Sequence, residues 1–464
     1  MSREVGLVDP VVKVVFPTGM LGSGFSEAAV SEGIALGATA IAVDAGSTDS
    51  GPYYLGTGVA KSSASAVEHD LRSLLTLSRR ADIPLVIGSC GTSGTDRGVD
   101  WMAEMAQRIG KEEGLSFRLA CIYSEIHPEI VVAALQGGRV KPLPPVAQVS
   151  ADDIRACQHI VGLMGHEPMA EALMAGADVV LAGRATDTAT VAALALMRGL
   201  PPGPAWHAAK TVECGGQCTV APRPGPVLVQ IDPDGFTVTP LSEDAFCTPT
   251  SVAAHMLYEN ADPFRLVEPP GVLDTSAARY VAIDDRRVRV TGSRFERAAK
   301  STVKLEGSRL AGFETIVLVG IRDPHVLSRI DEWLAGVEGT LRERVQSTLG
   351  LEAEDYRVEL RCYGHDGVLG NLETTRTSPA EVAVLLKVRA SDQGTATAIA
   401  MTANVLLLHM PLSGMQHLPS FAFATSPAEI EMGAAYEFVL NHVIEVDDPA
   451  ELVRTTFAEV KGGK

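Results

Sequence analysis

The sequence predicts an α/β protein: a mostly parallel, doubly wound N-terminal sheet, followed by a C-terminal α+β domain. Short apolar runs alternate with helical patterns through the first half of the chain, and such runs are typical of parallel strands buried on both faces. After residue 250 the pattern changes to paired strands with two long helices. A chain of 464 residues also exceeds one ordinary core, which predicts two or three domains.

Six strand–helix units make up the N-terminal half. The predicted strands cover 11–16, 39–44, 83–88, 117–122, 159–164 and 178–183. The predicted helices cover 26–37, 65–81, 99–114, 128–138, 167–177 and 187–199. An open doubly wound sheet is the first expectation, and a barrel, which needs eight such units, is the alternative.

The C-terminal half has a different order of elements. A hairpin is predicted over 280–292. It is followed by a strand, a helix, two strands, a helix and a strand over 313–321, 324–350, 355–364, 381–390, 395–410 and 436–446. This order is typical of the ferredoxin-like, split βαβ fold. We therefore predict an α/β domain over 1–213 that carries the active site, a connector over 214–250 and an α+β domain over 251–464.

Composition excludes several classes of protein. The net charge is −18 with no basic patch, so nucleic acid is not an expected partner. No apolar run approaches the ~18 residues of a membrane span, and the N-terminus lacks a signal-peptide pattern, so we expect a cytoplasmic protein. The seven cysteines are scattered, which disfavours a disulfide framework. Cys214 and Cys218 are one residue further apart than in a C-x-x-C motif and indicate zinc only weakly.

Polar loops follow all six predicted strands. They cover 17–27, 44–56, 89–100, 123–129, 165–168 and 183–188, and the loops at the other end of the strands are mostly bland. Ligands bind at the carboxyl ends of strands in open parallel sheets and in barrels alike. We therefore expect these loops to converge on one shared site.

Two glycine-rich loops and two arginines are expected to bind an anion. Glycines let backbone N–H groups approach an anion at a helix N-terminus, and arginine matches the geometry of a carboxylate or phosphate. The expected residues are Gly22, Ser23, Gly24, Gly91, Thr92, Ser93, Arg97 and Arg184. Neither loop matches a P-loop or a G-x-G-x-x-G motif, so the sequence carries no nucleotide-hydrolysis, nicotinamide or flavin signature.

The other loops supply candidates for acid–base catalysis. These are Asp44, Asp49, Glu125, His127, His166 and Asp187. Together they would transfer protons or hold a divalent metal, although no H-E-x-x-H motif occurs. For Asp187 the alternative is a helix N-cap, and for each histidine a structural role. Cys90 lacks a recognised nucleophile motif and is expected to be a buried thiol.

Three segments carry a resemblance to a known family. GSGFSE (22–27), GADVVLAGRATDTA (176–189) and FVLNHVIEVDDP (438–449) resemble the acyclic terpene utilisation (AtuA-like) family, and the similarity covers nearly the whole chain. The resemblance implies an enzyme of a catabolic operon that handles branched acids, such as those from citronellol and geraniol, as CoA esters. It carries over no catalytic roles. The segments 44–56 and 89–98 depart from the terpene-pathway members, so a terpene-derived substrate does not follow.

Taken together, these features predict a catabolic enzyme that acts on a small carboxylate or an acyl-CoA. Acid–base chemistry is expected, of the hydratase, dehydratase or isomerase type. The alternatives are a metal-assisted hydrolase and a non-catalytic ligand-binding or scaffolding subunit. We expect a homo-oligomer or a complex with a small partner subunit.

Overall fold

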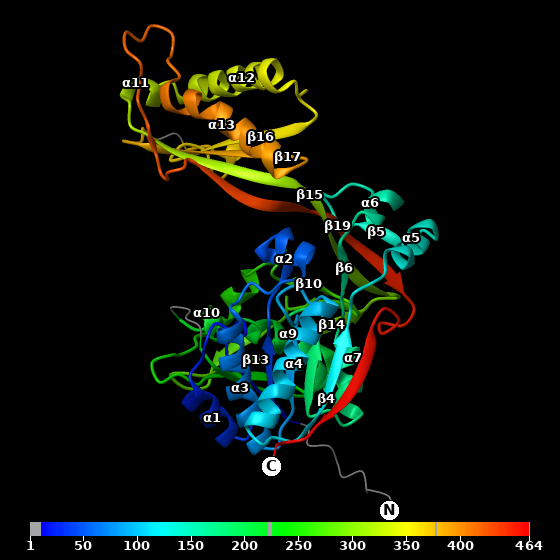
Figure 1. The fold of residues 1–464 in the computed structure, drawn as a ribbon. Coiled ribbons are helices and arrows are strands. Elements are labelled where there is room, and N and C mark those ends of the chain that lie inside the picture. The colour runs from blue at the N-terminus through cyan, green and yellow to red at the C-terminus, as the bar shows by residue number, and fades with distance from the viewer. Residues whose placement is uncertain (1–10, 221–224, 376–377, 464) are drawn as a thin grey trace, which may run out of the picture. The chain divides into compact units, whose positions relative to one another are not determined.

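The computed structural model describes residues 11–220, 225–375 and 378–463. The chain forms two compact units, which are described separately (Figure 1). Unit 1 comprises Met1–Arg309 and Phe438–Lys464, and unit 2 comprises Leu310–Glu437. The chain therefore divides at other positions than the predicted boundaries at 213 and 251, because the strands between residues 227 and 297 join sheets of unit 1.

The main sheet of unit 1 has ten strands among the described residues, and its centre is parallel. The parallel strands, in spatial order, are β1 (Val12–Phe16), β2 (Ala40–Asp44), β3 (Leu85–Gly88), β7 (Val179–Ala182) and β4 (Phe117–Tyr123). Side chains alternate between the two faces: Ile41 and Val43 enter one apolar core, whereas Ala40 and Ala42 enter the other. This burial on both faces explains the continuous apolar runs in the sequence.

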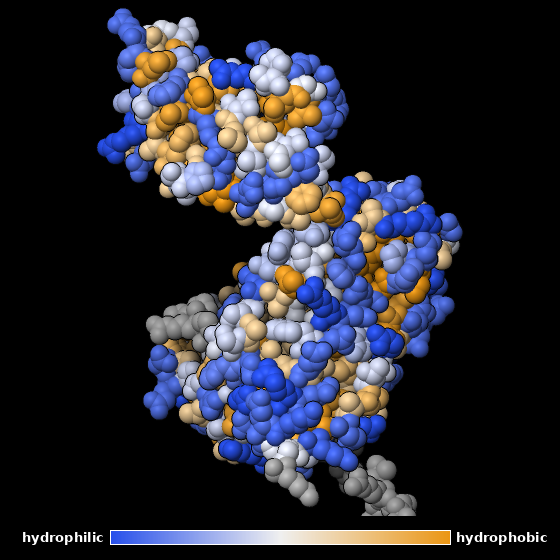
Figure 2. Space-filling view, viewed as in Figure 1, coloured by the Kyte–Doolittle hydropathy of each residue, from blue (hydrophilic) through white to orange (hydrophobic). Residues whose placement is uncertain are grey.

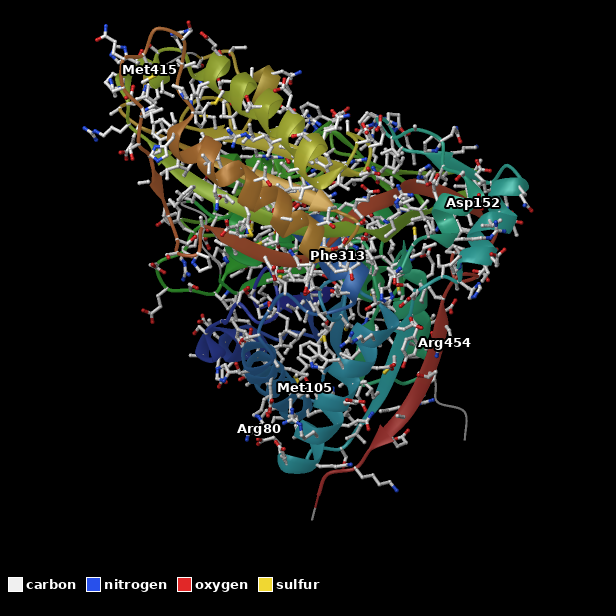
Figure 3. All side chains as sticks on the ribbon, turned by 45° about the horizontal axis from the view of Figure 1, so that its top comes forward. Arg80, Met105, Asp152, Phe313, Met415 and Arg454 are labelled. Carbon is white, nitrogen blue, oxygen red and sulfur yellow. The ribbon has the colours of Figure 1, made fainter. Side chains whose placement is uncertain are left out.

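Antiparallel strands extend this sheet at both edges. Beyond β1 lie β8 (Val227–Asp232), β9 (Gly235–Pro240), β13 (Val288–Thr291) and β12 (Arg279–Ala282). The pairing of β12 with β13 confirms the predicted hairpin. Beyond β4 lies β20 (Arg454–Val460), which the sequence analysis did not predict, and Arg454 of this strand is labelled in Figure 3. The sheet is open, since β12 and β20 form its two edges.

One predicted strand lies in another sheet. The run 159–164 forms β6 (His159–Leu163), which pairs antiparallel with β15 (Ser301–Ile321). The prediction that it joins the parallel sheet was wrong, because β7 occupies the place between β3 and β4. Periodicity identifies a buried strand but does not identify its partner.

Helices cover both faces of the main sheet. One face packs against α3 (Ala64–Arg80) and α4 (Asp96–Glu112), and the other against α7 (Glu167–Met174), α8 (Ala189–Leu196) and α9 (Pro202–Val212). The surface over α3 and α4 is largely hydrophilic (Figure 2), and ion pairs such as Arg72–Glu112 at 2.6 Å connect the two helices there. This polar outer face complements the apolar face that each helix buries.

Shorter elements complete unit 1. Its other helices are α1 (Glu27–Ala35), α2 (Pro52–Thr57), α5 (Pro128–Gln136), α6 (Ala151–Arg155) and α10 (Pro249–Ala254). A small antiparallel sheet contains β10 (Arg265–Glu268), β11 (Gly271–Asp274) and β14 (Arg294–Arg297), and β5 (Val140–Pro142) pairs with the end of β19 (Glu429–Val446). No helix in the described part of the chain is both long and apolar enough to span a membrane.

Unit 2 contains the predicted β-α-β-β-α-β order of elements. In chain order these are the second half of β15, α12 (Ile330–Leu349), β16 (Tyr356–Tyr363), β17 (Val382–Ala390), α13 (Gln393–His409) and the first half of β19. The short α11 (Pro324–Leu327) and β18 (Ala422–Phe423) complete it. The strand order is β16-β17-β15-β19, and the core lies between this sheet and the helices, with Trp333 of α12 fully buried.

Candidate active site

A cavity of about 280 Å³ lies at the carboxyl ends of β1, β2 and β7. Three of the polar loops meet here, those after β1, β2 and β7, together with a segment that follows α9 and the turn after α10. Its polar lining includes Thr18, Asp44, Asp49, Asp187, Cys214, Tyr258 and Glu259. Carboxylates therefore dominate the charge of the cavity wall.

Asp44, at the end of β2, is the most buried carboxylate of the wall, with 5% of its surface exposed. Its Oδ2 accepts a hydrogen bond from the Gly46 backbone at 3.0 Å, while its Oδ1 has no hydrogen-bond partner among the described residues. Burial, and after it the Asp187 carboxylate, raises the pKa of Asp44 well above its usual range, against the opposing effects of Arg184 and Ser89. This carboxyl group therefore favours its protonated form.

Thr18 provides a second buried polar atom without a partner. The residue is fully buried, and its Oγ1 makes no hydrogen bond to any described residue. Buried polar atoms nearly always find a partner in the protein, in water or in a ligand. Thr18 and Asp44 line the same cavity, so both unpartnered atoms belong to residues of its wall.

Asp187 lies in the loop between β7 and α8. Burial raises its pKa, against the opposing charges of Arg184 and Lys210. The N-cap position of α8 belongs to Thr188, so Asp187 is not the helix cap that the sequence left open as an alternative. Asp44 and Asp187 both line the cavity, and the charge of Asp187 disfavours ionisation of Asp44.

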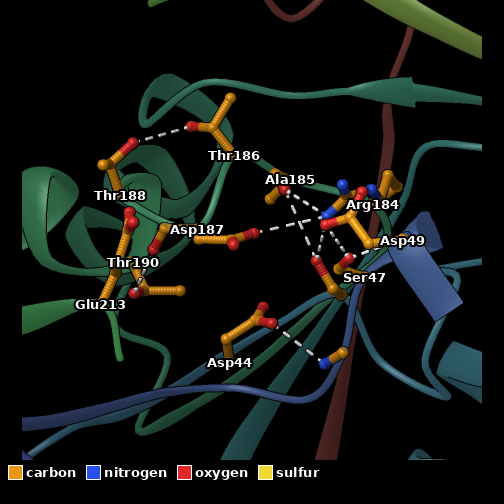
Figure 4. A network of polar contacts seen from close by, with 12 residues as sticks. Asp44, Ser47, Asp49, Arg184, Ala185, Thr186, Asp187, Thr188, Thr190 and Glu213 are labelled. Atoms are coloured by element: carbon orange, nitrogen blue, oxygen red, sulfur yellow. Dashed lines mark hydrogen bonds and ion pairs between the residues drawn. The ribbon is translucent and has the colours of Figure 1, made fainter. Parts of the chain in front are cut away.

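Arg184 contacts Asp187 from within the protein (Figure 4). Its Nη1 lies 3.4 Å from Asp187 Oδ1 and donates to Ser89 Oγ at 3.1 Å, and its Nε donates to Glu306 Oε2 at 3.0 Å. The guanidinium is 5% exposed and does not line the cavity. Arg184, which was expected to bind the substrate anion, contacts two of the protein's own carboxylates, Asp187 and Glu306.

The glycine loop after β1 binds a carboxylate that the protein itself supplies. The backbone N–H groups of Gly22 and Gly24 donate to Oδ2 of Asp70, at 2.7 and 3.0 Å. Asp70 belongs to α3 and is buried. Of this loop's predicted anion-binding residues, only Ser23 lines the cavity.

The second glycine loop is also occupied by internal contacts. Thr92 Oγ1 accepts from the Lys61 backbone at 2.9 Å, and Ser93 Oγ donates to the Tyr54 carbonyl at 3.2 Å. A Cβ on Gly91 would meet Gly98 at 2.5 Å, so this glycine serves close packing. Arg97 donates to the Thr57 carbonyl at 3.2 Å. The eight expected anion-binding residues therefore do not form one site.

Glu125 is one of three acid–base candidates that lie away from the cavity. Its Oε1 lies 2.6 Å from His159 Nδ1, and its Oε2 accepts from the Asp96 backbone at 2.9 Å. The sequence analysis did not identify His159 as the partner of Glu125. The contact depends on the position of β6, which was expected in a different sheet.

The two predicted histidines have local structural contacts. His127 is exposed and caps α5, where its Nδ1 accepts from the Glu129 backbone at 3.3 Å. His166 packs edge-on against Trp206, with its Nδ1 3.2 Å from Glu167 Oε2. Of the six acid–base candidates, the structure brings together Asp44, Asp49 and Asp187.

Two further buried carboxyl groups beside the cavity were missed. Burial raises the pKa of Glu213 to about 8, although Lys210 forms an ion pair with it. Burial also raises the pKa of Glu268 to about 8, against the opposing effect of the Thr188 hydroxyl, whose Oγ1 lies 3.1 and 3.0 Å from the two carboxylate oxygens. The signal for Glu213 is visible in the sequence: Lys210 and Glu213 are three residues apart in a mostly apolar helical run. Such a pair is placed to meet on one helix face.

A larger depression of about 910 Å³ lies in unit 2, beside α12. Its charged lining is paired: His365 Nε2 lies 2.7 Å from Asp331, and Arg329 Nε donates to Glu332 at 2.8 Å. We place the candidate site at the smaller cavity because Asp44 Oδ1 and Thr18 Oγ1, which are buried, have no hydrogen-bond partner among the described residues.

The chain was compared with known proteins. The sequence model of the acyclic terpene utilisation family protein AtuA matches residues 60–442. No curated protein and no solved structure matches the chain.

Proposed function

The chain belongs to the acyclic terpene utilisation family, and from that premise we propose that it is an enzyme that uses Asp44 and Asp187 for acid–base catalysis. The observation that carries the proposal is the raised pKa of two carboxyl groups in the cavity wall, buried Asp44 and half-buried Asp187, together with Asp44 Oδ1 and Thr18 Oγ1, which have no hydrogen-bond partner among the described residues. Pairs of titratable groups with perturbed pKa values are typical of catalytic acid and base.

Cavity size and charge favour an acyl-CoA over a free carboxylate. Asp49 and Glu259 line the cavity beside Asp44 and Asp187, of which one is ionised in the proposed reaction, so a small anion entering the cavity meets negative charge. A volume of about 280 Å³ accommodates a short acyl group, whereas the CoA moiety would stay outside. The reacting part of the substrate would then be neutral.

A carboxyl pair that shares one proton can dehydrate a 3-hydroxyacyl thioester, or hydrate the enoyl product. The ionised carboxylate removes the proton from Cα while the protonated partner donates its proton to the leaving hydroxyl group. The C–H and C–O bonds break, the C=C bond forms and water leaves. The pair ends with one proton, as it began, so the step needs no further co-reactant. On a 3-enoyl thioester the same groups would isomerise the double bond: the carboxylate removes the Cα proton, the C=C bond moves from C3–C4 to C2–C3, and the protonated partner donates its proton to C4.

Exchange of α-protons tests the proposal without knowledge of the full reaction. The protein is incubated in D₂O with a panel of short 3-hydroxyacyl- and enoyl-CoA thioesters, and deuterium uptake and hydration are followed by mass spectrometry. Asp44→Asn and Asp187→Asn should each lower turnover by ~10²–10⁴-fold, because each removes a catalytic proton-transfer group. Circular dichroism should show that both variants fold.

Asp82→Asn is the matched control, since Asp82 is exposed in the turn before β3, at the opposite end of that strand. Its backbone φ of 53° is one that asparagine adopts readily. Folded Asp44 and Asp187 variants with control-like turnover would refute the proposal. A wild type with no exchange on any thioester would favour a ligand-binding or scaffolding subunit instead.

A further inference from the structure

Three side chains next to the cavity have the composition of a metal site. The carboxylate of Glu213, the thiol of Cys214 and the imidazole of His255 place their donor atoms within 4.8 Å of one another. Glu213 and Cys214 directly follow α9, and His255 directly follows α10. We propose that these three residues bind a zinc ion.

His255 supplies the observation that points to a ligand. The residue is 6% exposed, and its Nε2 has no hydrogen-bond partner in the described part of the chain. A buried ring nitrogen without a partner is costly, so a ligand that coordinates it would remove the cost. The ring is also held in place, because it stacks on Tyr258 with centroids 5.6 Å apart.

The backbone of Lys210 orients the same ring. It forms a hydrogen bond with the His255 ring. Histidines that bind metals almost always donate their other ring N–H to a carbonyl or carboxylate, which presents the free nitrogen to the ion. The Lys210 side chain meanwhile bonds to Oε1 of Glu213 and fixes that carboxylate.

Cys214 is the ligand of the proposed site that lies in the cavity wall. It is half-buried and lines the cavity wall, whereas Glu213 and His255 lie behind the wall. One nitrogen, one sulfur and one oxygen donor form a borderline-soft set that suits zinc. Three protein ligands with an open fourth position are typical of catalytic rather than structural zinc.

The structure also shows why Cys218 is not the partner of Cys214. The Cys218 thiol faces the Gly215 carbonyl at 3.6 Å, and the Cys247 thiol faces the Cys218 carbonyl at 3.8 Å. Both thiols are buried. The zinc site therefore uses one cysteine, and Cys218 serves as a matched control.

Because none of its ligands is Asp44 or Asp187, the site goes beyond the proposed acid–base function and stands without it. The test is titration of the chelator-treated full-length protein with Co²⁺, followed by absorbance. A cobalt–thiolate bond produces a near-ultraviolet charge-transfer band that carboxylate or imidazole ligands alone do not produce. Competition with Zn²⁺ should abolish the band at one equivalent per chain.

Variants locate the ligands. Cys214→Ser should lose the charge-transfer band, and Glu213→Gln and His255→Gln should weaken Zn²⁺ binding by more than ~100-fold, since outer-shell changes alone cost ~10–100-fold. Cys218→Ser should bind as the wild type does. Circular dichroism confirms folding of each variant.

A second measurement needs no variant. Bound Zn²⁺ should slow alkylation of Cys214 in the wild-type protein, with the modified residue located by tandem mass spectrometry. Absence of the charge-transfer band in the wild type would overturn the proposal. So would a band lost in Cys218→Ser but kept in Cys214→Ser, or an alkylation rate at Cys214 that Zn²⁺ leaves unchanged.

Discussion

At the scale of single residues, Asp70 explains why a glycine-rich loop need not bind a substrate. The loop after β1 has the backbone geometry expected of an anion site, and its Gly22 and Gly24 amides do bind a carboxylate. The carboxylate comes from α3, 46 and 48 residues along the chain. Nothing in the local sequence identifies Asp70 as the acceptor, because the contact depends on how α3 packs beside the loop.

We expect Asp70 to contribute to the stability of the fold and not to catalysis. Asp70→Ala leaves two backbone N–H groups without their acceptor, and we expect a loss of about 1–3 kcal/mol in the free energy of unfolding. Asp70→Asn keeps a carbonyl oxygen and should lose less. Urea unfolding measures both, with His69→Ala, an exposed change in the same helix, as the control. A stability of Asp70→Ala equal to that of the control would contradict this role.

At the scale of elements, α9 is unusual because all of its residues from Gly203 to Val212 are buried. It carries His207, whose Nδ1 lies 2.7 Å from Ser293 Oγ and whose Nε2 lies 3.2 Å from the Tyr280 hydroxyl. Burial lowers the pKa of His207 from 6.5 to about 3. The folded protein therefore keeps this imidazole neutral under conditions in which the unfolded chain protonates it.

His207 should make the fold sensitive to acid. Between pH 6.5 and about 3 the unfolded state binds one more proton at this residue, so stability falls as the pH falls through that window and is unaffected by His207 above it. His207→Gln retains polar contacts without titrating. Its Tm should be below that of the wild type at pH 8, and this difference should shrink steadily as the pH is lowered from 6.5 to 4. A constant difference across this range would show that His207 does not carry the acid sensitivity.

Local sequence patterns predicted most helices and strands correctly. The prediction failed where the position of a strand depends on a partner far away in the sequence. The strands of the parallel sheet and the elements of unit 2 follow from hydrophobic periodicity, which is a local signal. The placement of β6 and the presence of β20 do not follow from this periodicity, because each depends on a partner strand far away in the sequence. The candidate site divides in the same way. Asp44 and Asp187 were found because they end or follow parallel strands.

Two ligands of the proposed zinc site, Glu213 and His255, were missed for a related reason, whereas Cys214 was considered only together with Cys218. Glu213 and His255 follow helices rather than strands, and 42 residues separate them in the chain (255 − 213). Only the packing of α9 against the turn after α10 brings them together.

At the scale of the whole molecule, unit 2 is an insertion into unit 1. The chain leaves unit 1 after Arg309 and returns at Phe438, within β15 and β19, which are hydrogen-bonded neighbours. Each of these strands continues from one unit into the other without a turn. The sequence therefore offered no boundary at 310 or 437, since domain limits are read from turns and linkers.

The two units should fold independently of each other. The apolar clusters of unit 1 contain no residue between 310 and 437, and the cluster of unit 2 contains none outside that range. Joining Arg309 to Phe438 by a two-residue Asn-Gly turn, which suits antiparallel strands, should leave a soluble protein with one cooperative thermal transition. The shortened protein should also retain any Co²⁺ site at Glu213, Cys214 and His255. A second variant joins the same residues by a longer Gly/Ser linker. It shows whether a failure of the first variant to fold is caused by strain in the short turn or by an unstable core of unit 1. If both variants aggregate or unfold without cooperativity, unit 1 depends on the inserted unit for its stability.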